Sequence, residues 1–376
     1  MDALSSTTGC CEPTPPRNTG PRRELSKLSL LTPHSSNIPP PSTLMATRPA
    51  THAGSWYSDN KATLTRQLDQ WLAAVPSSTT PIGTASSQQG SVSIPQKGVR
   101  AVIAPHAGFT YSGPAAAWAY KSVDWSKAER IFLLGPSHHH YLTDIETTAY
   151  SAYATPLGSL KIDDSTVSKL KADWGIKVMA RDVDNDEHSL EMHLPYIYKM
   201  LSLNFPNATK FPTLIPLLVG NTSGSTERHY GEALSPYLLD PTNIFIISSD
   251  FCHWGSRFRY TYYQPPNSKP VQLRPSSSVP TAYKIHESIA ATDLESMDAV
   301  ETGSHGAFLE QLEQTGNTVC GRHPIGVFMA AVEHVVERGG EGDVDGKFKF
   351  LRYERSGLVT DPRDSSVSYC SAFAVL

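Results

Sequence analysis

Val99-Arg100-Ala101-Val102-Ile103-Ala104 is a short apolar run that stops at Pro105-His106. Three more runs of this kind follow along the chain, at 131–134, 214–219 and 243–247. Short, continuously apolar runs bounded by Gly and Pro are typical of strands buried on both faces. We therefore predict that these four segments form the core of a largely parallel sheet.

Helical patterns alternate with these runs. Apolar residues recur at helical spacing in 60–74, 189–203 and 324–338, and two further strands are expected at 348–351 and 367–376. This alternation predicts an α/β fold, a single-domain α/β sandwich with a mainly parallel or mixed central sheet.

The composition argues against several classes of protein. The 376 residues carry a formal charge of -4, which argues against a dedicated nucleic-acid-binding protein. We find no apolar stretch long enough for a membrane span and no secretory signal pattern. The five cysteines are scattered apart from Cys10-Cys11, so no disulfide framework is visible. We expect a reducing location, cytoplasmic or also nuclear.

Three segments stand outside the α/β pattern. Residues 1–47 are rich in Ser, Thr and Pro, a composition that predicts disorder, and Met45 is an alternative start that leaves open whether 1–44 belong to the main product. Residues 48–376 form the predicted domain. Within it, 77–96 and 264–281 read as loop insertions.

Histidines follow three of the predicted strands. His106 ends the first, His138 lies in Ser137-His138-His139-His140, and His253 lies in the segment 248–253. Ligands bind beyond the carboxyl ends of strands in open α/β sheets, so these histidines predict a site. His106 and His138 are candidate metal ligands, because neutral imidazole is a common ligand. A backbone-capping His106 and a solvated His138 are the alternatives.

Cys320 is the candidate third ligand. Pro324 favours a helix start just after Cys320, and a helix N-terminus favours a thiolate. One soft sulfur with two imidazoles suits iron, copper or zinc. A small buried hydrophobe or a redox thiol are the other interpretations.

Several other polar residues are candidates for catalysis or ligand binding. His253 could act as a general acid or base oriented by Asp250, or the pair could be a capped helix start with a surface histidine. His193 is a weaker second base. Glu187 and Glu191 fall on one helical face, which is consistent with solvation.

Familiar catalytic motifs of other classes are absent from the sequence. The segment 186–196 lacks the His-Glu-x-x-His spacing of zinc proteases, and there is no Gly-x-Ser-x-Gly elbow. Neither phosphate-binding glycine motif appears.

Six motifs together resemble the Memo family, mediators of receptor-driven cell motility. They are His52-Ala53-Gly54-Ser55-Trp56-Tyr57, 104–113, Gly135-Pro136-Ser137-His138-His139, 186–196, 248–255 and 320–326, and the tail 364–369 fits as well. The resemblance runs from about residue 50 to the C-terminus, and Phe109 stands where the family has a tyrosine.

The resemblance implies a fold similar to class III extradiol dioxygenases, whose Fe(II) is held by two His and one Glu. It places His106, His138 and Cys320 at the metal ligands and His253 at the acid/base position. It also implies iron(II) or copper, a redox role, a part in cell motility, and a cytoskeletal regulator or phosphotyrosine-containing peptide as partner, bound near Trp56, His106 and His253.

Three functions remain open on this basis. The first is a metal-binding protein with redox activity, and the second is a non-catalytic phosphopeptide-binding module. The third is a dioxygenase acting on an aromatic diol, which the missing carboxylate disfavours because a thiolate donates more charge and is itself oxidisable.

Overall fold

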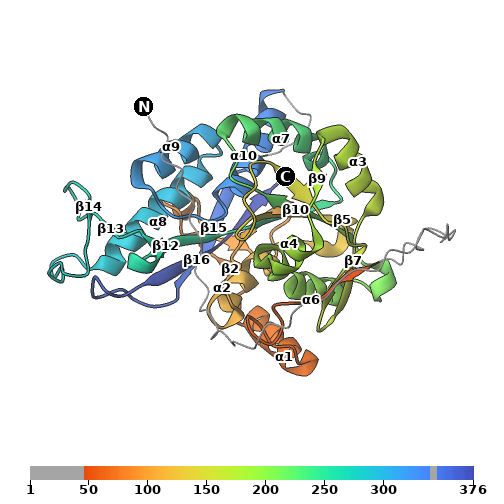
Figure 1. Ribbon diagram of the computed structural model, residues 1–376, viewed down its shortest axis with the longest axis horizontal. Coiled ribbons are helices and arrows are strands. Elements are labelled where there is room, and N and C mark those ends of the chain that lie inside the picture. The colour runs from red at the N-terminus through yellow and green to blue at the C-terminus, as the bar shows by residue number, and fades with distance from the viewer. Residues whose placement is uncertain (1–45, 339–344) are drawn as a thin grey trace, which may run out of the picture.

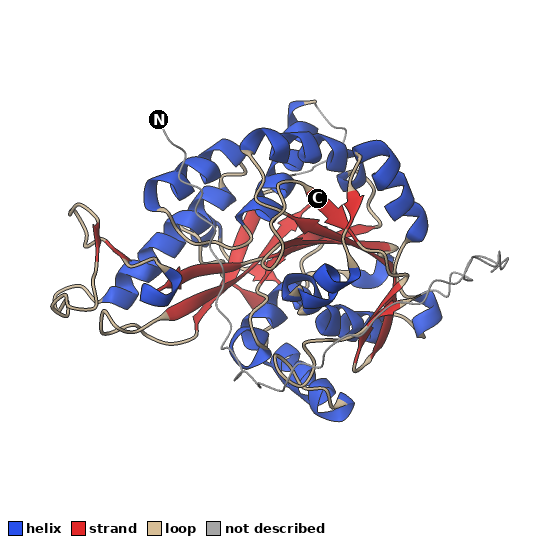
Figure 2. Cartoon of the chain, in the orientation of Figure 1, coloured by secondary structure: helices blue, strands red, loops and turns tan. Residues whose placement is uncertain are grey.

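The computed structural model describes residues 46–338 and 345–376 of the chain. Its main feature is a nine-stranded mixed sheet between two helical layers (Figures 1 and 2). The predicted α/β sandwich is therefore confirmed. The prediction of disorder for 1–47 concerns residues that lie outside the described part, apart from Ala46 and Thr47.

Four parallel strands form the centre of this sheet, in the order β4-β11-β5-β10. They are β4 (Val99–Ala104), β11 (Asn243–Ser248), β5 (Arg130–Pro136) and β10 (Thr213–Val219), which match the four predicted runs. Antiparallel strands extend both edges, so the sheet is mixed: β16 (Ser366–Val375), β12 (Asp250–Trp254) and β15 (Phe348–Arg355) on one side, and β6 (Ile145–Thr147), followed by β9 (Lys177–Val178), on the other.

Two helical layers cover the sheet (Figure 1). One layer contains α1 (Lys61–Ala74), α2 (Phe109–Ser122) and α6 (Leu194–Asn204), and the other contains α3 (Asp164–Trp174), α7 (Gly224–Leu238), α8 (Ile285–Glu301), α9 (His305–Thr315) and α10 (Arg322–Glu337). Short helices α4 (Arg181–Asp186) and α5 (His188–Glu191) precede α6. In the described part of the chain, three small sheets lie outside the main one. The first contains β1 (Thr47–Arg48), β7 (Ala152–Thr155) and β8 (Gly158–Lys161). The other two pair β2 (Ser78–Thr79) with β3 (Val92–Ser93), and β13 (Tyr262–Tyr263) with β14 (Val271–Gln272).

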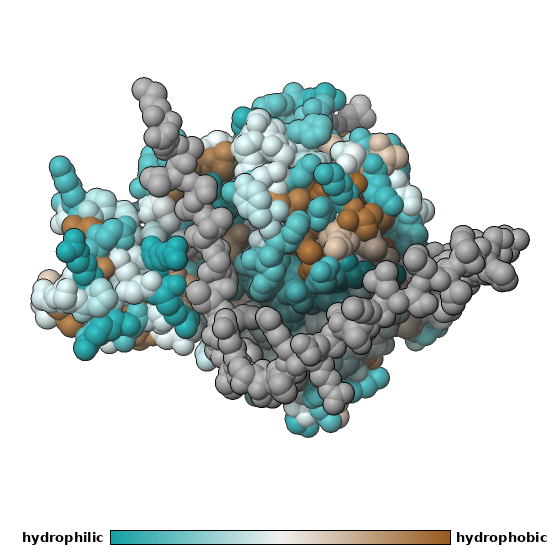
Figure 3. Space-filling view, in the orientation of Figure 1, coloured by the Kyte–Doolittle hydropathy of each residue, from teal (hydrophilic) through white to brown (hydrophobic). Residues whose placement is uncertain are grey.

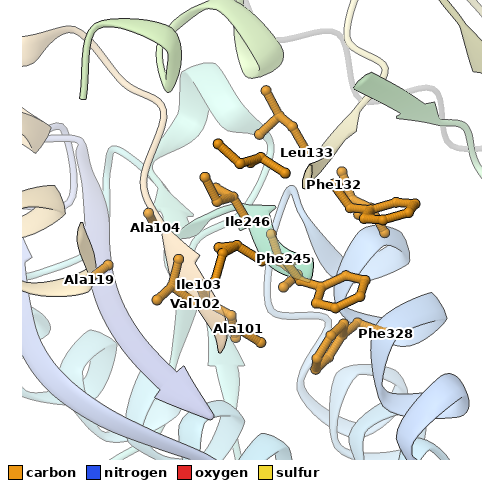
Figure 4. Packing of buried hydrophobic residues seen from close by; sticks show 14 of the residues in the cluster. Ala101, Val102, Ile103, Ala104, Ala119, Phe132, Leu133, Phe245, Ile246 and Phe328 are labelled. Carbon is orange, nitrogen blue, oxygen red and sulfur yellow. The ribbon is translucent and has the colours of Figure 1, made fainter. Parts of the chain in front are cut away.

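Aromatic side chains fill the space between the parallel strands and α10. Phe132 of β5 stacks on Phe245 of β11 with ring centres 5.1 Å apart, and Phe328 of α10 lies 5.7 Å from Phe245 (Figure 4). All three are fully buried. Burial of such rings is the largest source of core stability. On the outer face drawn in Figure 3, brown apolar residues form small patches between teal hydrophilic ones.

Two sequence interpretations need correction. The segment 189–203 is not one helix, because the chain breaks at Met192–His193 between α5 and α6, where Pro195 has no N–H to continue the ladder. The alternative of a helix start at Asp250 is also wrong, since Asp250–Trp254 forms strand β12 beside β16.

The predicted insertion at 77–96 has a structural role. Ile82 N–H donates to Phe350 O at 2.8 Å, and Ser86 Oγ donates at 2.9 Å to Glu301 of α8, which also accepts from Phe350 N–H at 2.9 Å. Phe350 belongs to β15, the edge strand next to β16. An uncovered edge strand is a template for unwanted pairing, so these contacts protect the sheet.

A buried arginine ties β1 to the helices before α6. Arg48, 1 % exposed, pairs with Asp184 at 2.9 Å and with Glu191 at 2.6 Å. It also donates to the carbonyl oxygens of Asp184, Asn185 and Glu187. Because these acceptors belong to one turn of chain, the guanidinium fixes the path of residues 184–191.

We predict that Arg48→Lys lowers the free energy of unfolding by about 3 kcal/mol, because an ammonium cannot reproduce the planar fork and leaves buried carboxylates short of partners. Urea unfolding measures the change. Arg338→Lys is the matched control, since the exposed Arg338–Glu232 pair is worth at most about 1 kcal/mol. Equal losses in the two variants would contradict this account of Arg48.

Candidate metal centre

Three segments that are far apart in the sequence bring His106, His138 and Cys320 together. His106 follows β4, His138 follows β5, and Cys320 lies two residues before α10. One nitrogen of each histidine and the cysteine sulfur all lie within 4.8 Å of one another. The distance from His106 Nε2 to Cys320 Sγ is 3.2 Å. The sequence-predicted ligand set is therefore a compact group at the carboxyl edge of the parallel strands.

The hydrogen bonds of His106 define its free nitrogen. Its Nδ1 lies 2.6 Å from Ser248 Oγ, and Ser248 donates its own proton to Ser189 O at 2.8 Å. Since that hydroxyl proton is already used, His106 Nδ1–H must be the donor, which leaves a lone pair on Nε2. Burial, with the nearby His138, lowers the pKa of His106 well below its usual value, so the ring is neutral.

Glu187 orients His138 in the same way. Its carboxylate accepts from His138 Nδ1 at 2.9 Å and from His138 N–H at 2.7 Å. Burial alone would raise the pKa of Glu187, but the charge and hydrogen bond of His138 outweigh it and hold that pKa far below the ordinary value. The carboxylate therefore stays ionised, His138 keeps its proton on Nδ1, and Nε2 is available as a ligand.

Backbone contacts hold the cysteine sulfur in place. Asp250 N–H approaches Cys320 Sγ at 3.2 Å, and Gly321 N–H donates to Ser249 Oγ at 3.1 Å. An N–H donor at sulfur and the start of α10 both favour a thiolate. The chemistry of the donor set, two imidazoles and one sulfur, fits iron, copper or zinc.

Asp250 lies beside this group as a supporting residue. Its Oδ1 accepts from His106 N–H at 2.9 Å. Burial raises its pKa to about 7, and the hydrogen bond from His106 opposes the rise. Asp250 and His253 share strand β12 but no hydrogen bond between their side chains is found among the described residues.

His253 presents one open nitrogen near the ligands. Its Nδ1 donates to Phe251 O at 2.8 Å and approaches Thr318 O at 3.2 Å, so Nε2 carries the lone pair. Burial lowers its pKa to about 4, and the backbone bonds only partly offset that effect. His253 is thus a neutral base near pH 7, and its charged form contributes to the lowered pKa of His106.

His193 takes a different place from the other candidates. It is buried at the start of α6, and its Nδ1 lies 2.6 Å from the hydroxyl of Tyr120 on α2. Burial lowers its pKa to about 3. The charged form of His193 contributes to the lowered pKa of His106. His193 is nevertheless not part of the ligand group.

Trp56 is linked to the site by ring contacts with two histidines, His188 and His52, that the sequence did not single out. Its ring lies 4.5 Å from that of His188, and His188 stacks on His138 at 4.3 Å. His52 contacts Trp56 edge-on. A stacked row of rings therefore joins Trp56 to a candidate ligand.

The solvation interpretation of Glu187 and Glu191 is wrong, because both are buried. Glu191 accepts from His52 Nδ1, Tyr57 Oη and Arg48, each within 2.9 Å. A signal was present in the sequence, since each glutamate lies beside or within one turn of a histidine. Helical spacing alone could not distinguish a solvated face from a face turned toward buried donors.

We predict a specific pH dependence for Glu191. Burial raises its pKa, but the His52 bond and the Arg48 charge prevail and lower it from 4.5 to about 2. The unfolded chain thus binds more protons between these values, and stability is lost as the pH falls through that window. Urea unfolding from pH about 5.5 to about 3.5 should show a shallower decline for Glu191→Gln than for the wild type. The same change at exposed Glu310 should leave the slope unaltered.

Comparison with known proteins identifies the family of the chain. Residues 48–373 match the family model described as Memo-like protein. The chain is 41% identical over 332 residues to Protein MEMO1 of Danio rerio, covering 88% of this chain and 98% of that protein. Protein MEMO1 of Homo sapiens is 40% identical over 324 residues, with 86% and 96% covered, and Protein memo-1 homolog of Caenorhabditis elegans is 40% identical over 325 residues, with 86% and 81% covered. The chain belongs to the Memo family.

Proposed function

We propose that this protein binds one transition-metal ion, iron or copper, through His106, His138 and Cys320, and that the bound ion gives it redox activity. The observation that carries the proposal is that one nitrogen of each histidine and the cysteine sulfur lie within 4.8 Å of one another, while the Nδ1 atom of each histidine is engaged by Ser248 or Glu187. A bound ion would supply one-electron chemistry.

The surrounding residues would serve that ion in defined ways. Glu187 and Ser248 hold the ligand rings in place, and neutral His253 offers a proton acceptor beside the centre. Partial burial of the site restricts access by water. Membership of the Memo family supports extending the proposal to a role in cell motility and cytoskeletal signalling.

Ring-cleaving dioxygenase activity is not part of the proposal. No carboxylate among the described residues joins His106 and His138 as a third converging ligand. The two nearest, Glu187 and Asp250, are occupied by N–H donors of the ligand residues themselves. A thiolate is softer and more easily oxidised than a carboxylate, which favours copper or iron binding over oxygen insertion.

Metal analysis after anaerobic loading with Fe(II) or Cu(I) tests the proposal. We expect a stoichiometric ion in the wild type and a loss of at least about tenfold in affinity for Cys320→Ser and for His106→Ala, because each variant lacks one ligand. His139→Ala is the matched control, since His139 is exposed and adjacent to His138 without belonging to the ligand group. Equal metal content in all four proteins would refute the assignment.

A second function, recognition of a phosphorylated peptide, is favoured by the rim of the same site. The exposed Arg257 guanidinium lies over the Phe258 ring at 4.4 Å, and Phe258 contacts the His253 ring edge-on at 5.2 Å. The positive charge of Arg257 contributes to lowering the pKa of His253, so this cation lies near the site. Arginine forms strong paired hydrogen bonds with phosphate.

Titration with a tyrosine-phosphorylated peptide and its plain counterpart tests this second function. We expect the phosphate to improve binding at least about tenfold, and Arg257→Gln to remove most of that gain. Arg274→Gln, at another exposed position in the chain, is the control. Equal binding of the two peptides by the wild type would exclude this function.

A further inference from the structure

A second histidine–carboxylate cluster lies at the start of α10, close in the chain to Cys320. Glu227 of α7 is 1 % exposed and accepts from His305 Nε2 at 2.5 Å and from His323 Nδ1 at 2.7 Å. His305 begins α9, and His323 lies in the first turn of α10. One carboxylate therefore joins three helices at the end of α10 that is nearest Cys320.

The same cluster reaches the loop that carries His138. His323 Nε2 contacts Asn221 Oδ1 at 2.9 Å, and Asn221 N–H donates to Leu142 O at 2.6 Å. Leu142 lies four residues beyond His138, and Ser137 N–H is held by Val219 O of β10 at 2.9 Å. A chain of hydrogen bonds thus runs from Glu227 through His323 and Asn221 to the His138 loop.

The cluster also lies one turn from the third ligand. His323 is three residues after Cys320, and Ile325 N–H donates to Gly321 O at 2.9 Å to close the first turn of α10. Movement of His323 would therefore move the turn to which Cys320 is attached. The two ligand segments, which follow β5 and precede α10, share His323 as a common anchor.

Two glycines allow these close approaches. A Cβ at Gly326 of α10 would lie 2.4 Å from Glu227 Oε2, and a Cβ at Gly220 would lie 2.1 Å from Leu142 O. Neither distance is compatible with a real side chain. The backbone is therefore shaped so that the carboxylate can lie against α10 and the loop can lie against the end of β10.

Glu227, His305 and His323 are not a further metal site. Among the described residues, the groups whose ligand atoms converge both contain His138 and lie at the centre already described. Each histidine of the cluster instead uses one nitrogen on a different oxygen of Glu227. Burial raises the pKa of Glu227, but these two hydrogen bonds outweigh it and the pKa is lowered, so the carboxylate stays charged.

We propose that Glu227, together with His305 and His323, is a positioning cluster that sets the placement of Cys320 relative to His138 and thereby tunes the metal centre. This inference rests on the proposed metal-binding function. It assigns the tuning to residues outside the ligand group, through hydrogen bonds that end on both ligand-bearing segments. The residues act on the metal only through Cys320 and the His138 loop.

Co(II) is the probe for the test, because thiolate ligation gives it an intense charge-transfer absorption that reports on the metal–sulfur bond. We expect Glu227→Gln to weaken or shift this band and to raise the Kd for Co(II) by about tenfold, since an amide can accept from only one side and donates on the other. A cluster that only stabilises the fold would lower the melting temperature and leave the band of the folded protein unchanged.

The chain offers a matched control on the same pair of helices. Glu232 of α7 also joins α10, through an exposed pair with Arg338 at 3.3 Å. Glu232→Gln removes a carboxylate between α7 and α10 without touching the chain of bonds to Cys320, so its Co(II) spectrum should equal that of the wild type.

Asn221→Ala keeps the test decisive if Glu227→Gln does not fold. Asn221 is exposed, so the substitution does not threaten the core, and it removes the contact between its side chain and His323. We expect a smaller change of the Co(II) band in the same direction. Unchanged spectra in Asn221→Ala and in any folded Glu227→Gln would overturn the inference, whereas a wild type without a thiolate–Co(II) band would refute the metal site itself.

Discussion

The Arg48 guanidinium is the interaction on which the candidate site depends most. It binds two buried carboxylates and the three carbonyl oxygens of Asp184, Asn185 and Glu187. A buried charge of this kind is tolerated only when every donor finds an acceptor. That requirement fixes the backbone of residues 184–191, and this short stretch supplies Glu187 to His138, His188 to Trp56 and Glu191 to His52.

The carboxylates around the candidate centre contact the candidate ligand residues or their neighbours. Glu187 fixes the ring of His138, and Asp250 accepts from the backbone of His106. Glu227 lies one step further away and holds His323. Such outer contacts decide the tautomer and direction of each ligand, and they usually contribute as much to a metal site as its geometry does.

Much of this arrangement follows from local sequence patterns. The runs 99–104, 131–134, 214–219 and 243–247 predict the parallel strands because burial on both faces requires continuous apolar residues, and their carboxyl ends place His106 and His138. The break before α6, the strand at Asp250 and the burial of Glu187 and Glu191 were not predictable in the same way. The burial of the glutamates and the strand at Asp250 depend on partners more than 40 residues distant, such as Arg48 for Glu191 and β16 for β12.

The presence of a cysteine at position 320 has a structural explanation in this distribution of charge. Every carboxylate near the two histidines is already occupied by N–H donors, and releasing one would leave a buried donor without an acceptor. A thiolate needs fewer hydrogen bonds than a carboxylate and is stabilised by the Asp250 N–H and the start of α10. The sulfur can therefore complete the donor set of the proposed site without breaking the hydrogen bonds that orient His106 and His138, and a metal that accepts sulfur would fit such a set.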